Sequence, residues 1–482
     1  MVLRRETHLQ HFETTPYAHR YLLKKPRTHD RQRPAVRAVI LDGPEEEETA
    51  KIDNPWVEKR MRLPLGRFEL FVDLIWVGII GNVAENFSEE AFNLETGVHA
   101  SSAVWHFIIL FLMAWRFWKY LQDFIAKYDT DDLVERAFVV WALILAMLWG
   151  NNATFLFKPD SQSNFAIGIY LVWRGSVLLC EAYYAFFIHQ IRDRIILQKL
   201  VIISVLPLWI VAEFYGIEVK SGLGFAAVVV EAMAQTLIDS PFVVDRFLHA
   251  DDRDDSFNAD HWIERISGFY IIILGEGVLS LIRGSPLEEG ITLHADGSVL
   301  ALIAYYVLCG FYFNGDQSKR RIHAAKRATW WRKSLWLFFH NILFGSTLIL
   351  GVSVVFMIQH IEDSAVESSE TEGQGEESTV RQATAIYAAK WMVSVSLSLA
   401  LMNQTLIALL NRSMDPPGTL KTNNRLLRLL PRALLVPIFL CLPIPKPMGI
   451  LSFLGAVSGL PLGCLQWEWW SSLERGGDII ER

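Results

Sequence analysis

The sequence has little of what a disulfide-bonded or redox protein needs. It holds four cysteines in 482 residues, and no two of them have CxxC spacing. All four lie within or at the ends of apolar runs: Cys180, Cys309, Cys441 and Cys464. Thiols in such places are typical of a hydrophobic core, so we expect free cysteines.

The chain also lacks the motifs of the common membrane-embedded enzymes. There is no HExxH, no GxSxG and no histidine-rich box, so the sequence lacks the usual residue patterns for zinc-dependent or serine-dependent catalysis. His106, His189 and His340 fall in separate apolar runs, where hydrogen-bonded core histidines are common. His8 and His11 have metal-ligand spacing but lie in a polar tail. We therefore predict no enzyme activity, no catalytic residue, no cofactor and no metal site.

A cleavable signal is absent as well. The first 60 residues are polar and basic and contain no short apolar core. The 45 basic and 52 acidic residues give a net charge of −7, and nothing in this balance indicates nucleic acid. No organelle address is legible, which leaves the plasma membrane as the default location.

Long apolar runs are what the chain has in abundance. The composition is 52% hydrophobic and 12% aromatic, with 17 tryptophans, as in a polytopic membrane protein. A helix needs about 20 residues to cross a hydrocarbon core of about 30 Å. The sequence predicts an all-α bundle of about twelve spans, at 68–87, 98–115, 137–157, 165–189, 200–216, 224–244, 262–282, 298–315, 335–358, 383–410, 426–442 and 447–467.

The loops between these runs alternate in basic content. Even-numbered loops carry two or more Lys or Arg, and odd-numbered loops carry none or one. Because basic loops stay in the cytoplasm, both termini are predicted to be cytoplasmic. Prolines interrupt the last two runs, so whether both cross fully stays open.

The same pattern divides the chain into five parts. Residues 1–66 are predicted to be a disordered, basic cytoplasmic tail, and residues 67–358 a membrane domain of spans one to nine. An acidic disordered loop follows at 359–382, then a C-terminal set of spans at 383–467. Residues 468–482 are predicted to be a cytoplasmic tail.

A short internal similarity suggests a duplication. Span four contains Ile169 and Tyr170 followed by Arg174, and span ten contains Ile386 and Tyr387 followed by Lys390. The two spans are six apart. A six-plus-six repeat would give both halves the same orientation, as in several transporters.

One cytoplasmic loop is unusually basic. Residues 318–333 contain seven Lys or Arg beside two tryptophans. Such a segment can contact anionic lipid of the inner leaflet, at roughly 1 kcal/mol per basic residue. Ordinary topology-setting charge explains the loop equally well, and both interpretations stay open.

Ionisable residues inside the spans are the main candidates for function, because a charge at mid-bilayer costs roughly 2.5–3.5 kcal/mol on insertion scales. Five deep acids face only two deep bases, Arg174 and Lys390, so one or two acids are expected to be protonated, hydrated or bound to a cation. The alternative is that these groups are structural ion pairs. The predicted polar core contains Glu69, Asp73, Arg174, Glu181, Glu231, Asp239, Glu264, Arg265, Glu276, His340 and Lys390.

Three finer expectations follow from spacing. Arg265 is predicted to pair with Glu264 or Glu69 at the cytoplasmic edge. Glu276, between two glycines deep in span seven, is the best single candidate for proton coupling. Gly455, Gly459 and Gly463 recur every four residues and are predicted to pack within the fold rather than in a dimer.

Two motifs resemble the low temperature requirement A (LtrA) family of membrane proteins. RFELFVDLIWV at 67–77 is similar to the family's opening pattern, and HWIERISGFYIIILGEGVLSL at 261–281 is similar to its E-R and L-G-E helix. WRFWKYLQDFIAKYDTDDLVERA at 115–137 and LWLFFHNILFG at 335–345 resemble two further segments. The tails and the acidic loop suggest a larger, eukaryotic and fungal version.

The resemblance implies a multi-pass membrane protein linked to growth in the cold, without an established biochemical activity. The family's motif positions transfer to this chain, but their roles do not. These positions are Glu69, Asp73, Asp131, Asp132, Glu264, Arg265, Gly275, Glu276 and His340.

Three classes of function stay open on the sequence. The first is transport of an ion or small solute, coupled to protons through the buried carboxylates. The second is a receptor or assembly scaffold without transport. The third is a lipid-modifying enzyme, which the missing motifs argue against. The oligomeric state is not encoded in any pattern that we recognise.

Overall fold

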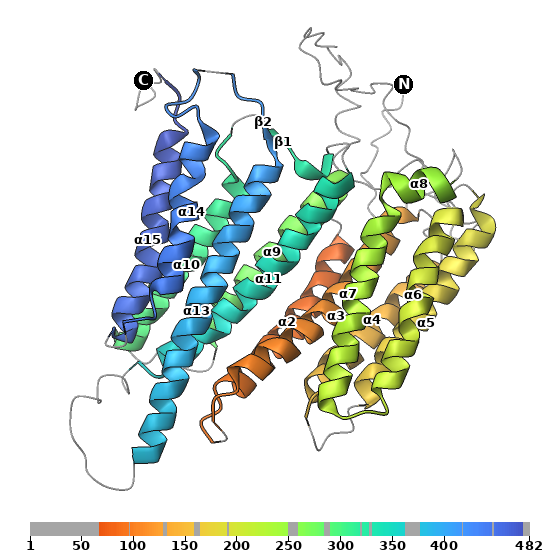
Figure 1. The fold of residues 1–482 in the computed structure, drawn as a ribbon, viewed down its shortest axis with the longest axis horizontal. Helices are drawn as coiled ribbons and strands as arrows, with labels where there is room; N and C mark the ends of the chain where they lie inside the picture. Colours follow the sequence, from red (N-terminus) through yellow and green to blue (C-terminus); the bar gives the residue numbers. More distant parts are fainter. Residues whose placement is uncertain are drawn as a thin grey trace, which may run out of the picture.

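The structure is a bundle of long helices. The computed structural model describes residues 67–95, 97–128, 133–158, 164–189, 192–248, 259–283, 290–318, 321–326, 330–361, 376–416, 418–445 and 448–475. Within these ranges twelve helices have 17 residues or more (Figure 1). They are α2 (Arg67–Ala91), α3 (Ala100–Lys127), α4 (Leu133–Asn152), α5 (Asn164–Phe187), α6 (Arg192–Ala212), α7 (Ile217–Ile238), α9 (Ala259–Ile282), α10 (Leu293–Asn314), α11 (Trp330–Gln359), α13 (Glu376–Leu410), α14 (Arg425–Cys441) and α15 (Ile450–Ser471).

These twelve helices follow the order of the twelve predicted apolar runs. Ten of them are long and apolar enough to cross a membrane. The other two are α2, which carries acidic side chains at both ends, and α14, which has 17 residues and two internal prolines. The prediction of an all-α, multi-pass membrane protein is confirmed at this level, and the number of crossings stays a prediction.

Two predicted boundaries are wrong. Helix α13 begins at Glu376, so residues 376–382 belong to a helix and not to the acidic loop. Helix α15 continues to Ser471, and Glu474 pairs with Leu420, so 468–475 are not a tail. Sequence hydropathy misses both ends because these turns are polar. The N-terminal tail and residues 362–375 lie outside the described residues.

The long helices form two groups of six, α2 to α7 and α9 to α15, joined through the short helix α8 (Pro241–Phe247). We call them the first and second halves. In each half the first helix packs on the second and third, and the second helix packs on the third and sixth. The third also packs on the fourth, the fourth on the fifth, and the fifth on the sixth. The halves lie side by side in Figure 1.

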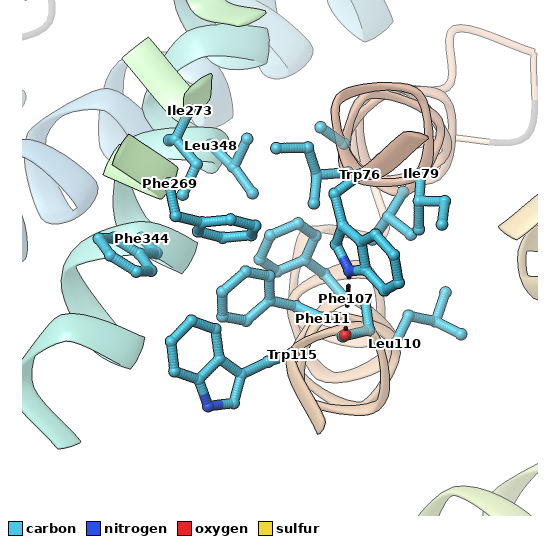
Figure 2. Close-up of a cluster of buried hydrophobic side chains, with 14 of the residues drawn as sticks. Trp76, Ile79, Phe107, Leu110, Phe111, Trp115, Phe269, Ile273, Phe344 and Leu348 are labelled. Carbon is cyan, nitrogen blue, oxygen red and sulfur yellow. Dashed lines mark hydrogen bonds between the residues drawn. The ribbon is translucent and has the colours of Figure 1, made fainter. Parts of the chain in front are cut away.

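The halves meet at an aromatic cluster. Figure 2 shows Trp115 of α3 beside Phe344 of α11, and the rings of α3 between Trp76 of α2 and Phe269 of α9. The ring of Trp115 packs edge-on against both phenylalanines, at centroid distances of 5.8 and 5.7 Å. Trp76 also donates its indole N–H to the carbonyl of Ala114 at 3.3 Å. Such ring pairs contribute roughly 0.5–1.5 kcal/mol each beyond area burial, so this cluster fixes how the halves are joined.

The predicted lipid-contact loop is partly folded. Within its described residues, β1 (Arg321–Ile322) pairs antiparallel with β2 (Arg412–Ser413), and the 3-10 helix η4 (Ala324–Lys326) follows. Burial, together with the nearby charges of Arg321 and Lys326, lowers the pKa of His323 to about 4. His323 is therefore uncharged near neutral pH and adds nothing to the basic character of the loop.

The glycine ridge of α15 does not pack within the chain. A Cβ built on Gly455, Gly459 or Gly463 would meet no atom within 4 Å. The opposite face of α15, with Phe453 and Leu465, is buried where α15 contacts α10 and α14. The prediction of internal helix packing through these glycines is therefore wrong, because the bulky face makes that contact instead.

The outward ridge predicts that Gly459→Leu does not lower the melting temperature in detergent. Leucine gains helix propensity, up to about 1 kcal/mol, and meets open space. The control is Gly310→Leu on α10, where a Cβ would lie 2.9 Å from Leu465 of α15. Overpacking there should lower stability by about 1–3 kcal/mol. An equal loss for Gly459→Leu would show that another surface covers the ridge.

Candidate functional site

A large cavity lies between the two halves. Its volume is about 910 Å³, and its walls come mainly from α3 and α7 of the first half and from α11 and α13 of the second. In Figure 1, α7 stands on one side of the boundary between the halves and α11 on the other. We call this space the interhalf cavity. Its size is near the upper end of the range typical of ligand sites.

The interhalf cavity has a charged end. Six basic and four acidic side chains line it, with a further arginine directly behind. Three of these acids each lie within salt-bridge distance of two cations, an arrangement that we call a trio. The trios are Glu181 with Lys127 and Lys199, Glu231 with Arg116 and Arg174, and Asp239 with Arg194 and Lys333.

The Glu231 trio is the deepest. Glu231 of α7 and Arg174 of α5 are each 1% exposed and form a direct ion pair. Arg116 of α3 lies 3.8 Å from Glu231 and donates to Gln235 at 2.6 Å. Gln235 in turn donates to Glu231 at 3.1 Å. This network ties three helices together, and the low dielectric of the bilayer strengthens it.

The Glu181 trio lies closer to the end of α3. Lys127 and Lys199 approach the Glu181 carboxylate to 3.5 and 3.8 Å. Tyr128 donates its hydroxyl to the same carboxylate at 2.8 Å. Burial, and then the Glu181 charge, raise the pKa of Tyr128 above its ordinary value. The phenol therefore stays protonated and remains a donor.

The Asp239 trio bridges the two halves. Arg194 at the start of α6 lies 2.5 Å from Asp239, which caps the end of α7. Lys333, at the start of α11 in the second half, lies 3.8 Å from the other carboxylate oxygen. These side chains are partly exposed, so the pair across the boundary is weaker than the buried trios.

Beyond the charged residues the cavity wall is mostly apolar, with Asn341, Ser346 and Ser396 as polar exceptions. The lining there includes Val104, Phe107 and Phe111 from α3 and Phe225 from α7. At 1.5 Å per helical residue, Arg116 lies about 16 Å from the Lys127 end of α3, and the apolar lining continues past it. One cavity therefore combines a cationic end with a hydrocarbon-like end.

A second buried ion pair joins the halves outside the cavity. Arg265 of α9 donates to Asp73 of α2 at 2.6 Å and to Gln122 of α3 at 3.0 Å. Trp118 also donates to Asp73 at 3.2 Å. The expected partners were Glu264 or Glu69, and the structure adds Asp73, one helical turn after Glu69, as a partner of Arg265. The side chain of Glu69 lies outside the described residues.

Glu276 is buried but does not line the interhalf cavity. It is 7% exposed and lies where α9 crosses α2, so close that a Cβ on Gly81 would be 2.8 Å from Glu276 Oε1. Its cationic neighbour is Arg283, whose largely exposed guanidinium is 3.9 Å away. The flanking Gly277 is buried and packs against the ring of Tyr305, which a Cβ at this position would overlap.

The remaining predicted polar groups lie elsewhere in the bundle. His340 is 1% exposed, with Nδ1 2.7 Å from the carbonyl of Trp336 and Nε2 3.1 Å from the Tyr312 hydroxyl. Lys390 donates to the carbonyl of Met448 at 2.6 Å. Glu264 is half-buried at the start of α9. Asp131 and Asp132 lie outside the described residues.

The expected excess of unpaired acids largely disappears. Of the five deep acids, Asp73, Glu181, Glu231 and Asp239 each lie within 4 Å of a basic side chain that is itself mostly buried. Glu276 is the exception. The count from sequence is wrong because it assigned Arg116, Lys127, Lys199, Arg194 and Lys333 to loops, whereas their helices extend further than the apolar runs.

A signal for these missed cations was present in the sequence. Arg116, Lys119, Asp123 and Lys127 follow one another at helical spacing, so a polar stripe continues the second apolar run for three turns. In the structure all four side chains line the interhalf cavity. Within the described residues no group of three His, Cys, Asp or Glu is placed to hold a metal ion.

Comparison with known proteins identifies the family. A family model described as bacterial low temperature requirement A protein (LtrA) matches residues 65–458. The chain therefore belongs to the LtrA family, and it is a multi-pass integral membrane protein. No curated protein and no solved structure matches the chain.

The Asp73–Arg265 pair predicts a double-mutant rescue. Asp73→Leu alone leaves the Arg265 charge buried without its carboxylate, so we expect a loss of about 3–5 kcal/mol. Arg265→Met alone should be similarly harmful. The double variant should recover most of the stability, because no unpaired charge remains.

Thermal melting in detergent, with recovery of monodisperse protein, measures this rescue. Lys119→Met with Asp123→Leu is the control, since Lys119 and Asp123 are one turn apart on a single helix and partly exposed. Additive losses in the Asp73 and Arg265 double variant would mean that the two residues do not act as a pair.

Proposed function

We propose that this protein is a transporter whose substrate site is the interhalf cavity. The observation that carries the proposal is a cavity of about 910 Å³ that both six-helix halves line and that holds six basic and four acidic side chains. Charged residues within membrane spans mark substrate or ion pathways more often than they mark structural positions.

The proposed architecture is a duplication. We infer that all twelve long helices cross the membrane, that both termini are cytoplasmic, and that the halves are parallel repeats. Seven helix pairings that the two halves share support this. Transporters built in this way hold the substrate between their repeats and move one repeat against the other. The plasma membrane remains the proposed location.

The contacts between the halves suit such a movement. Helix α2 packs on α9 and α11, while α3 packs on α11 beside the cavity. Across the cavity mouth the halves are joined by the partly exposed contact between Asp239 and Lys333. Because the two groups are 3.8 Å apart and partly exposed, this contact is weaker than the buried trios and can break without unfolding a helix.

Proton coupling through Glu276 is not part of the proposal. Glu276 lies against Gly81 and Tyr305 and away from the cavity lining. The acids that do line the cavity already lie beside cations. We propose that a substrate exchanges with these salt bridges, and that Glu276 is a packing group where α2 crosses α9.

A flux assay with purified protein in vesicles tests the proposal. The probes are radiolabelled acetate and phosphate for small anions, rubidium for cations, and a fluorescent anionic phospholipid whose movement between leaflets is followed by dithionite quenching. We expect protein-dependent movement of at least one anionic probe. Val395→Trp, which fills the cavity from α13, should slow it about fivefold or more by overpacking.

The control is Val380→Trp on the same helix, at a position that is 62% exposed and outside the cavity lining. It should keep full flux. Absence of movement for every probe, with folded protein and intact vesicles, would overturn transport and favour the receptor or scaffold.

A further inference from the structure

We propose that the interhalf cavity binds an anionic membrane lipid, with the headgroup at the trios and the acyl chains along the apolar wall. The inference rests on the proposed function in one respect, that this cavity is the substrate site. It names the class of substrate as an anionic amphiphile instead of an inorganic ion.

The separation of polar and apolar lining is the first support. The Glu181 and Asp239 trios occupy the end of the cavity where α3 and α7 finish and α6 and α11 begin, and the Glu231 trio lies about two helical turns further in. The opposite end is lined by Phe107, Phe225 and Met392, among other apolar side chains. An inorganic ion would gain nothing from such walls, whereas each buried CH₂ of an acyl chain contributes about 0.8 kcal/mol.

The rim of the cavity is the second support. Four apolar side chains belong both to the lining and to the outer surface of the bundle: Met233, Leu237, Phe338 and Val395, with exposed fractions of 63%, 55%, 55% and 36%. They lie on α7, α11 and α13, which are candidate spans. In a bilayer this side of the cavity faces hydrocarbon, so a lipid can enter it sideways.

Charge is the third support. In every trio a single carboxylate lies between two cations, and the lining as a whole holds more basic than acidic side chains. The surplus positive charge suits a headgroup with one net negative charge. By the predicted topology this end is cytoplasmic, which is the leaflet where anionic lipids concentrate.

The trios also suggest how a headgroup is accommodated. Lys333 and Lys127 are each the second cation of a trio, at 3.8 and 3.5 Å from carboxylates that have other cations nearby. Either ammonium can turn toward a phosphate while Glu181 and Asp239 each keep a second cation. Asp239 would then remain in its salt bridge with Arg194, and Glu181 in its salt bridge with Lys199.

Photolabelling tests the inference. The probe is phosphatidylglycerol with a diazirine on one acyl chain, added to purified protein in detergent and then mapped by peptide mass spectrometry. We expect adducts on α3, α7, α11 and α13. Unlabelled phosphatidylglycerol should compete at least about tenfold better than phosphatidylcholine, and inorganic phosphate should not compete, since it lacks acyl chains.

The matched variants remove charge while Glu181 keeps Lys199 and Asp239 keeps Arg194. The double variant Lys127→Gln with Lys333→Gln should reduce labelling about fivefold or more, or about 1 kcal/mol. Arg332→Gln, one residue from Lys333 and outside the cavity lining, should leave labelling unchanged. The competition on the wild-type protein stands even if the double variant fails to fold.

Three results would overturn the inference: equal competition by phosphatidylcholine, displacement by inorganic phosphate alone, or adducts spread evenly over the bundle. The two proposals fail separately. Selective labelling without any flux would leave the lipid site in place and remove the transporter. Flux of acetate or rubidium without selective labelling would keep the transporter and remove the lipid.

Discussion

The constraint on which the structure depends is that no charge can be buried in a membrane without a partner. The Asp73–Arg265 pair shows it most directly, because it fastens α2 of the first half to α9 of the second at full burial. The same constraint fixes the trios around Glu181 and Glu231, and the Arg432–Glu468 pair that joins α14 to α15 at 2.5 Å. Charge pairing therefore determines where helices of the bundle meet, and the aromatic cluster completes the contact between the halves.

Within that constraint the cavity is the exception to tight packing. The halves contact each other along α2 and part of α3. Beside this contact lies the interhalf cavity, which has a charged end and a mostly apolar end. The membrane-protein family, the shared helix pairing and the amphipathic cavity support the transport that we propose.

Much of the fold could be predicted from the sequence, and the candidate site only in part. Apolar runs located the twelve long helices because burial in lipid selects for continuous hydrophobicity. The sequence ended the second span at Trp115, whereas α3 continues to Lys127, and it began the fifth span at Leu200, whereas α6 begins at Arg192. Charged helical turns that line a cavity have the composition of loops. Asp73 was not expected as a partner of Arg265, because residues 192 positions apart can be paired only in three dimensions. Glu468, which the sequence assigned to a tail, is fully buried because it pairs with Arg432 of another helix.

The most direct test of this account is a cryo-electron microscopy map of the protein in nanodiscs that contain phosphatidylglycerol. The account predicts elongated density inside the interhalf cavity, with its head between Lys127, Lys199 and Lys333 and its tail passing Phe111. The density should weaken when phosphatidylcholine is the only lipid. A cavity that is closed by contact of α7 with α11, or that holds no density in either lipid, would contradict the account.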